Sequence, residues 1–258
     1  IFSNNQILYR ITSHSKRIMK TTKFLSCVLI FIISTLFIAC DDQTEVPKLV
    51  SAPEAKAAYD NNSGGVIKGV MVGSSGVFKF VLKNGNDSVY CTTTFDGASG
   101  MLTTTDLADW SPGEAIERAK FSGKLGSTDV VVYLSCAANG TAIVVDFQIA
   151  GHFIVSTPIK ETSTQLVKAY EGTYKTTKIS DNSTVDEGIF NFVLINNGIF
   201  GTRYSSTHSE SRNIKGIVNG NTLTVDDKVM SIDDTKVSCN ITISDGTEKL
   251  VVNGSRTL

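Results

Sequence analysis

The residue types that most often hold metals or perform acid–base chemistry are few and poorly spaced in this chain. Two histidines follow residue 18; Asp146 lies six residues before His152, and Glu210 lies two residues after His208. Neither spacing is that of a zinc site. The chain also has no Gly-x-Ser-x-Gly turn and no glycine-rich phosphate loop. The sequence therefore predicts no metal ion, no cofactor and no catalytic residue that can be named.

Carboxylates occur as neighbouring pairs at Asp226-Asp227 and Asp233-Asp234, and the stretch 181–188 (DNSTVDEG) has a faint likeness to a calcium loop. An EF-hand loop needs oxygen ligands at alternate positions, a central glycine and a distant glutamate, and none of these stretches has that order. We expect them to form turns and strand ends. Catalytic carboxylate pairs leave no fixed spacing in a sequence, so a glycosidase-like site stays open as an alternative.

The single tryptophan is the best candidate for contact with a ligand. Trp110, with Tyr90 or Tyr133 nearby, could stack on a sugar or an apolar molecule, because aromatic side chains concentrate at binding sites. The alternative is that Trp110 covers the end of a hydrophobic core.

Three cysteines follow residue 40. Cys91 and Cys136 fall in the same predicted module, so they are the expected disulfide pair if the protein is exported to an oxidising compartment. Two buried free thiols are the alternative. If Cys91 and Cys136 form a disulfide, Cys239 is left without a partner.

These residues are carried by stretches with the alternation of β-strands. Phe78, Phe80 and Leu82 fall on one face and Lys79 and Lys83 on the other, which predicts a strand with one buried face. The sequence GVFKFVLKN at 76–84 recurs as GIFNFVLIN at 188–196, with six of nine positions identical. Internal repetition of this kind indicates two copies of one structural module.

Weaker correspondences follow in the same order, at offsets of 106 to 112 residues. They pair 89–92 with 199–202, 139–141 with 245–247, and 58–59 with 169–170; a pairing of 121–123 with 214–216 has a different offset and is doubtful. Asn and Gly at the ends of the alternating stretches predict hairpin turns.

One short helix is expected in the first copy. Ser111, Pro112 and Glu114 have the order of an N-cap, a first helical residue and the glutamate of a capping box.

The predicted fold is therefore all-β: two tandem duplicated antiparallel modules, barrel- or sandwich-like, at 58–156 and 169–258. Residues 157–168 form the predicted linker, and residues 40–57 form a tether before the first module. We favour barrel-like closure of each copy, because closure hides the sheet edges. One larger sheet built from both copies is the alternative.

The N-terminal part has the order of an export signal. Lys20 and Lys23 precede an uncharged, largely apolar stretch at 24–39, which is short for a membrane-spanning helix. Residues 37–40 (FIAC) resemble the lipobox of bacterial lipoproteins, with Phe37 where leucine is commonest. The resemblance implies that Cys40 is acylated, becomes the mature N-terminus and anchors the protein to a membrane.

The same resemblance sets the expected boundaries and location. Residues 1–18 are expected to be a non-native leader before Met19, and 19–39 the signal peptide. Asp41 and Asp42 resemble sorting signals, which in some Gram-negative groups retain a lipoprotein at the inner membrane and in others export it to the surface. We expect a lipid-anchored protein of the bacterial cell envelope, at the outer membrane, with the periplasmic or surface face left open.

Charge and composition narrow the function. The chain has 24 basic and 25 acidic residues, which argues against a nucleic-acid partner. The leading hypothesis is a non-enzymatic binding or interaction protein, held at the membrane through Cys40, whose ligand is an unidentified glycan, small molecule or protein. A secreted hydrolase with paired carboxylates between the modules, and a structural subunit of the envelope with an exposed apolar patch or free sheet edge, are the alternatives.

Overall fold

The structure is a computed structural model that describes residues 49–258, and these residues belong to one compact unit. The predicted leader, the signal peptide, Cys40 and the pair Asp41-Asp42 lie outside the described residues. Within residues 49–258, no helix is both long enough and apolar enough to cross a membrane.

The described chain is almost entirely β, as predicted. The first half contains a 3₁₀ turn and eight strands: η1 (Ala57–Tyr59), β1 (Gly65–Val72), β2 (Gly76–Leu82), β3 (Val89–Phe95), β4 (Ala98–Thr103), β5 (Ile116–Leu125), β6 (Thr128–Cys136), β7 (Val144–Ile149) and β8 (Val155–Glu161). The second half contains β9 (Val167–Lys178), β10 (Thr184–Ile195), β11 (Gly198–Ser205), β12 (Glu210–Asn219), β13 (Thr222–Val225), β14 (Lys228–Ile232), β15 (Lys236–Ile243), η2 (Ser244–Gly246) and β16 (Glu248–Arg256).

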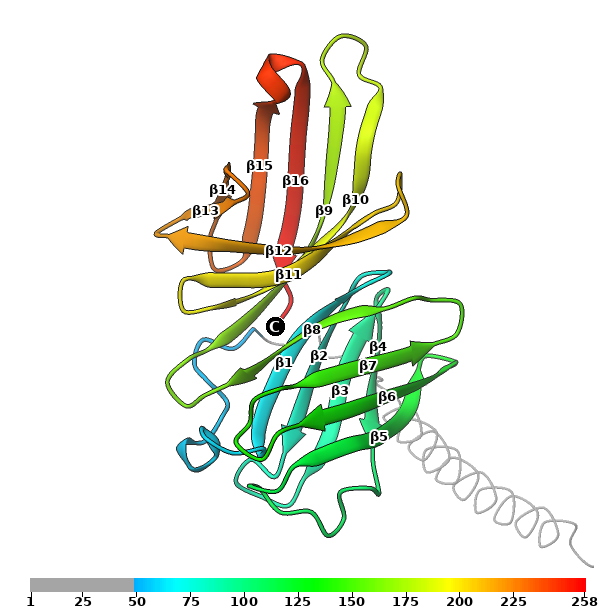
Figure 1. The fold of residues 1–258 in the computed structure, drawn as a ribbon, viewed down its shortest axis with the longest axis vertical. Coiled ribbons are helices and arrows are strands. Elements are labelled where there is room, and N and C mark those ends of the chain that lie inside the picture. The colour runs from blue at the N-terminus through cyan, green and yellow to red at the C-terminus, as the bar shows by residue number, and fades with distance from the viewer. Residues whose placement is uncertain (1–48) are drawn as a thin grey trace, which may run out of the picture. The chain divides into compact units, whose positions relative to one another are not determined.

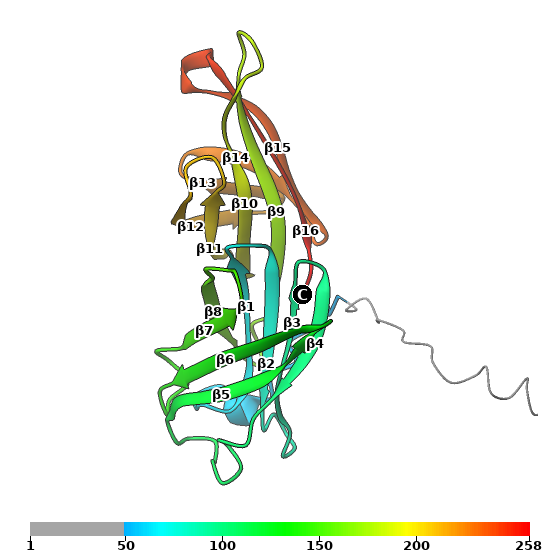
Figure 2. The same cartoon turned by 90° about the vertical axis from the view of Figure 1, so that its right-hand side faces the viewer.

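Strands β1 to β8 form one antiparallel sheet in the order β7-β6-β5-β4-β3-β2-β1-β8. The sheet curls over on itself, so that β5 and β6 cross β2 and β3 (Figures 1 and 2). Its concave side encloses a core that includes Phe78, Phe80, Phe121 and Phe147. The end strands β7 and β8 approach each other without a backbone ladder, and Ser156 on β8 donates a side-chain hydrogen bond to the carbonyl of Val145 on β7.

Strands β9 to β16 form a closed barrel, because β16 pairs with β9 along its length. Closure leaves no unpaired edge. Phe190, Phe192 and Leu194 face the barrel interior, as Phe78, Phe80 and Leu82 do in the first sheet. The alternation in the two related nine-residue stretches therefore predicts the buried faces correctly.

The two halves repeat the same strand order, which supports the duplication. Phe80 pairs with Ile67 and Cys91, and Phe192 pairs with Tyr170 and Gly201, so Cys91 and Gly201 occupy equivalent places. The correspondence of 89–92 with 199–202 is confirmed.

Other proposed correspondences are wrong. Residues 58–59 lie in η1, whereas 169–170 lie in β9. The turn at 139–141 joins β6 to β7, the sixth and seventh strands of its sheet, but 245–247 joins the seventh and eighth strands of the barrel. The doubtful pair 121–123 and 214–216 lies on the fifth and fourth strands. Asn-Gly and Asp-Gly are common at hairpin turns of any position, so such matches identify a turn and not its place in the fold.

The helix expected after Ser111 does not form. The Ser111 N–H does donate to Glu114 Oε2 at 3.0 Å, as in a capping box, but β5 begins at Ile116. The buried Ser63 hydroxyl donates to the Glu114 carbonyl at 2.6 Å and accepts from the Gly113 N–H at 3.1 Å, so it takes groups that a helix would use. Strand pairing with β6 then outweighs the local signal, and the short helix of the first half is η1.

The module boundaries also differ from the prediction. Strand β8 pairs with β1 and completes the first sheet up to Glu161, and β9 begins at Val167. The connection is therefore 162–166, shorter than the predicted linker of 157–168.

The contacts between the two halves include a small apolar cluster and a buried amide. The cluster joins Val70 and Val77 to Val167, Ala169 and Val193. Asn191 of β10, which is fully buried, donates from its amide nitrogen to the Met71 carbonyl of β1 at 2.9 Å.

Candidate functional site

The second barrel holds a cavity of about 220 Å³ at one end of its interior. Each of the eight strands supplies at least one lining residue, and one more comes from the β13–β14 turn: Tyr174, Thr176, Phe190, Arg203, Ile214, Val225, Asp226, Lys228, Met230, Ile243, Leu250 and Val252. Eight-stranded barrels have an interior that side chains either fill or leave wide enough for one small ligand.

The cavity lies at one end because the other end is filled. There Tyr170 stacks on Phe192 with ring centres 4.9 Å apart, and Ile199 and Leu223 are fully buried around them. At the cavity end, several inward positions carry polar or charged side chains instead of large apolar ones. Thr176 and Arg203 are two of them.

A polar cluster on three strands borders the cavity. The Tyr174 hydroxyl donates to Asp186 Oδ2 at 3.0 Å, and the Ser205 hydroxyl donates to Asp186 Oδ1 at 2.6 Å. Arg203 Nη1 lies 4.0 Å from Asp186 Oδ2. Burial, together with the hydrogen bond to the Asp186 carboxylate, raises the pKa of Tyr174. The hydroxyl of Tyr174 therefore stays protonated at neutral pH and remains a donor.

A smaller cavity of about 180 Å³ lies in the first sheet, bordered by residues that include Phe95, Asp96, Leu125 and His152. The His152 ring packs edge-on against Phe95, with ring centres 4.9 Å apart. Asp96 is the one carboxylate among its lining residues, as Asp226 is in the barrel cavity. Neither cavity therefore contains the carboxylate pair that a glycosidase-like site needs.

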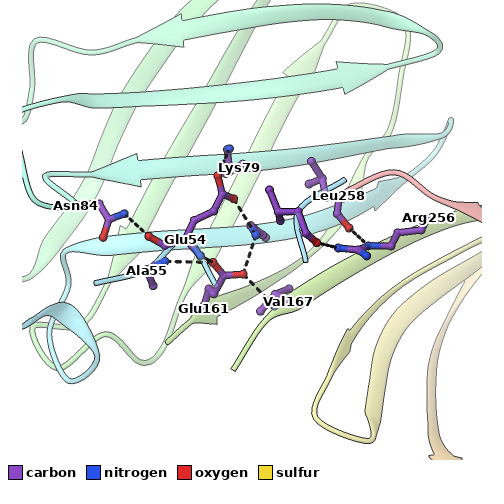
Figure 3. Close-up of polar contacts among 10 residues, drawn as sticks. Glu54, Ala55, Lys79, Asn84, Glu161, Val167, Arg256 and Leu258 are labelled. Atoms are coloured by element: carbon purple, nitrogen blue, oxygen red, sulfur yellow. Dashed lines mark hydrogen bonds and ion pairs between the residues drawn. The ribbon is translucent and has the colours of Figure 1, made fainter. Parts of the chain in front are cut away.

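A buried charge network joins the start of the described chain to both halves (Figure 3). Glu161 at the end of β8 is fully buried, and its Oε2 accepts from Lys68 Nζ at 2.7 Å and from the Val167 N–H at 3.0 Å. Its Oε1 accepts from the N–H groups of Glu54 and Ala55, at 2.7 and 3.3 Å. A buried carboxylate must have such partners, because removing a charge from water is expensive.

Glu54 extends the network to the surface of the first sheet. Its carboxylate lies 2.9 Å from Lys68 Nζ and 2.9 Å from Lys79 Nζ. Burial alone would raise the pKa of Glu54, but the hydrogen bonds and charges of Lys79 and Lys68 bring it below its usual value. Further along, Arg256 of β16 donates to the Val50 carbonyl. Residues 50–55 are thus fastened to both halves.

Trp110 is not available to stack on a ligand. It is 7 % exposed and belongs to the core of the first sheet, and its indole N–H donates to the Glu114 carbonyl at 3.2 Å. Its burial agrees with the alternative, in which Trp110 belongs to the hydrophobic core.

Tyr90 and Tyr133 do not converge with Trp110. Their strand neighbours Cys91, Val132 and Leu134 point into the core, so by alternation both tyrosines lie on the outer face. The Arg118 guanidinium lies 4.1 Å from the centre of the Tyr133 ring and covers it. The predicted stacking site does not form.

The predicted disulfide is not formed. Cys91 and Cys136 are buried free thiols on β3 and β6, with β4 and β5 between those strands in the sheet, and Cys239 is also free. The alternative of two buried thiols describes the structure. Burial raises the pKa of Cys91 well above its usual value, so this thiol is poorly reactive.

Asp181 and the pairs Asp226-Asp227 and Asp233-Asp234 lie in turns, as predicted, whereas Asp186 and Glu187 of the stretch 181–188 lie within β10. Asp233 accepts hydrogen bonds from the N–H groups of Thr235 and Lys236, at 2.7 and 2.9 Å, and Asp181 accepts from Ser183 at 2.9 Å. In the described part of the chain, no group of three His, Cys, Asp or Glu side chains is placed to hold a metal ion.

Sequence reasoning missed the cavity residues. Arg203 alternates with Ile199 and Gly201 along β11, so the strand period already placed a charged residue on the inward face. A charged residue at a position where alternation predicts an inward side chain was the signal in the sequence. Its meaning depends on closure of the barrel, which brings Arg203 opposite residues from distant strands.

Comparison with protein-family models, with curated proteins and with solved structures finds no match to this chain in any of the three. Functional conclusions therefore depend on the residues and geometry of the chain itself.

Proposed function

We propose that this chain is a lipid-anchored binding protein of the bacterial cell envelope whose second barrel takes up a small, largely apolar molecule. The observation that carries the proposal is the cavity that all eight strands of the closed barrel line. Ligand sites are typically concave and mostly apolar, with a few placed polar groups, and barrel mouths are a common location. The lining of this cavity has that composition.

The N-terminal segment supports the anchored part of the proposal. Residues 50–55 are hydrogen-bonded to Glu161 and Arg256. A membrane anchor that precedes residue 50 would therefore tether both sheets. Acylation of Cys40, which the lipobox resemblance implies, would supply that fixed point, and anchoring by more than one acyl chain is stable.

The two alternative functions have less support. The hydrolase needs two carboxylates that converge at one cavity. The cavity of the first sheet has Asp96 alone; at the barrel cavity Asp226 is exposed in a turn, and Asp186 already accepts hydrogen bonds from Tyr174 and Ser205. The assembly subunit needs a free sheet edge or a large apolar patch. The unpaired edges of β7 and β8 face each other, and the most exposed apolar side chain, Phe153, is in the loop between them.

The test uses the chain from Asp41, which contains every described residue. Its methionines Met71, Met101 and Met230 are labelled at the methyl group and observed by NMR during titration with 1-octanol. Met230 lines the cavity, Met71 is buried in the first sheet and Met101 is exposed. We expect a saturable shift of the Met230 signal alone.

A matched pair of variants locates the site. Leu250→Trp should fill the cavity and abolish the Met230 response, whereas Val251→Trp, on the opposite face of β16, should preserve it. The proposal fails if Met230 does not respond in the unmodified chain, or if Leu250→Trp binds octanol as the unmodified chain does.

A further inference from the structure

The Arg203 guanidinium borders the cavity with its hydrogen-bond donors unused. It is held by the Asp186 carboxylate at 4.0 Å, and its Cζ lies 5.6 Å from the centre of the Tyr174 ring. Both Asp186 oxygens already accept hydrogen bonds, from Tyr174 and Ser205. Within residues 49–258, no acceptor takes a hydrogen bond from the Arg203 guanidinium. Asp186 and Tyr174 therefore orient the cation without saturating it.

A second arginine lies directly opposite the first. Arg212 of β12 pairs with Arg203 of β11, so both side chains are on the face of the sheet that points inward. Like charges opposite each other on a sheet are destabilising. Arg212 is compensated by Glu210, whose Oε1 lies 2.8 Å from Nη2. Arg203 has Asp186 beside it at 4.0 Å, a carboxylate that takes no hydrogen bond from it, so its donors remain open to a further acceptor.

The carboxylate at the cavity does not fulfil this role. Asp226 is exposed in the turn between β13 and β14. Lys228 Nζ reaches its backbone carbonyl at 3.3 Å and forms an ion pair with Asp227. Solvent and Lys228 therefore screen this end of the cavity, and Arg203 remains the cation with free donors.

Apart from Tyr174, Thr176, Asp226 and Lys228, the residues that line the cavity with Arg203 are apolar. Phe190, Ile214, Met230 and Leu250 surround the space beside Arg203. A volume of about 220 Å³ suits a short alkyl chain or one ring, and it is below the range of drug-sized ligand sites.

We infer that the ligand of the second barrel is a small amphipathic anion, whose acidic group binds Arg203 and whose apolar body lies against Phe190, Ile214, Met230 and Leu250. The planar guanidinium matches a carboxylate with two parallel hydrogen bonds, which an ammonium group does not do. This inference rests on the proposed function, because it names the class of molecule that the same cavity takes.

The experiment compares octanoate, 1-octanol and octylamine at pH 7, again through the Met230 methyl signal. The three probes share one alkyl chain and differ in charge. A hydrogen bond to a charged group contributes about 1.5 to 3 kcal/mol, so we expect octanoate to bind roughly tenfold or more tighter than octanol, and octylamine to bind weakest.

Arg203→Gln removes the charge and keeps a side chain of similar length. We expect it to bring octanoate to within about twofold of octanol, measured as the ratio of the two affinities within the same variant, and circular dichroism checks that the barrel is intact. Lys215→Gln, which removes an exposed cation on the outer face of β12, should keep the full preference. Arg203→Lys should give an intermediate preference, since it keeps the charge but not the planar fork.

The outcomes separate the two proposals. If octanol binds as tightly as octanoate in the unmodified chain, or if Arg203→Gln retains the preference, the inference is overturned and the binding function stands. If none of the three probes shifts the Met230 signal, both are overturned.

Discussion

The two sheets have the same strand order and differ in one pairing and in what occupies their interiors. In the barrel, β15 pairs with β16, whereas the corresponding strands of the first sheet, β7 and β8, meet only through side chains. The open sheet encloses a core with Trp110 and five phenylalanines and has a cavity of about 180 Å³ beside Phe95, whereas the closed barrel has a cavity of about 220 Å³ that all eight strands line. Closure of the backbone and filling of the interior are therefore independent features of this fold.

The placement of charge differs in the same way. The first sheet carries its buried ion pair, Lys68 with Glu161, outside the aromatic core, where it fastens the N-terminal segment. The second carries Arg203 and Asp186 beside its interior. One copy therefore uses an ion pair to hold the N-terminal segment, and the other places an ion pair beside a cavity.

One pair of positions illustrates how the copies diverged. Lys79 in β2 and Asn191 in β10 occupy the same place in the repeated nine-residue stretch. Lys79 pairs with Glu54 at a partly exposed site, and Asn191 is buried against β1. The two copies therefore differ at one polar position on the outer face. In the first sheet this residue holds the N-terminal segment, and in the barrel it contacts the neighbouring sheet.

The largest expected effect is on the free energy of unfolding, compared between variants at two equivalent phenylalanines. Phe78→Ala should lower the free energy of unfolding by about 4 kcal/mol, because this fully buried ring packs against Phe80 and Phe147. Phe190→Ala should cost about 2 kcal/mol, since Phe190 already borders the cavity and has fewer neighbours to lose. Urea titrations followed by Trp110 fluorescence for the first sheet, and by circular dichroism for both, measure the difference.

The control for this comparison is Phe200→Ala, on the exposed face of β11, which should change stability by less than about 0.5 kcal/mol. Equal losses for Phe78→Ala and Phe190→Ala would mean that the two interiors are packed alike.

A smaller effect is expected at the buried ion pair. Glu161→Ala should destabilise the chain by about 3 kcal/mol, because it removes one buried partner of Lys68 and leaves three backbone N–H groups without an acceptor. Limited proteolysis should also release the segment before Ala57 more readily. Glu117→Ala, at an exposed position of β5, is the matched control. Similar stability of the two variants would show that the network does not hold the segment.

The smallest effect is a dependence on pH at Glu54. Its pKa is below the usual value of 4.5 in the folded chain, so its ion pairs stabilise the fold fully above that value, and the contribution disappears as pH falls through the folded pKa. Glu54→Gln should therefore be less stable than the unmodified chain at pH 7, by less than about 1 kcal/mol, and the difference should shrink as the pH falls below 4.5. A difference that persists or grows in acid would contradict this assignment.

Much of the fold follows from local patterns. Alternation in 76–84 and 188–196 identifies the buried faces of β2 and β10, and Asn196 adopts the positive φ of 52° that its hairpin turn needs. These features depend on neighbours in the sequence and can be inferred without knowing the fold. The helix expected after Ser111 fails for the opposite reason, because Ser63, fifty residues away, competes for its backbone groups.

The candidate site depends still more on distant residues. Arg203 looks like an ordinary strand residue until β9 and β16 pair and enclose it with Phe190, Met230 and Leu250. The same holds for Glu161, whose partners come from β1, the N-terminal segment and the start of β9.

By itself the sequence determined the strand class, the duplication and the faces that turn inward, because side-chain alternation and turn residues act over a few positions. Only the tertiary structure decided that one sheet closes by backbone pairing, that its interior keeps a cavity, and that Trp110 belongs to a core. These outcomes depend on how side chains from eight strands share one enclosed volume, and no short stretch of sequence contains that information.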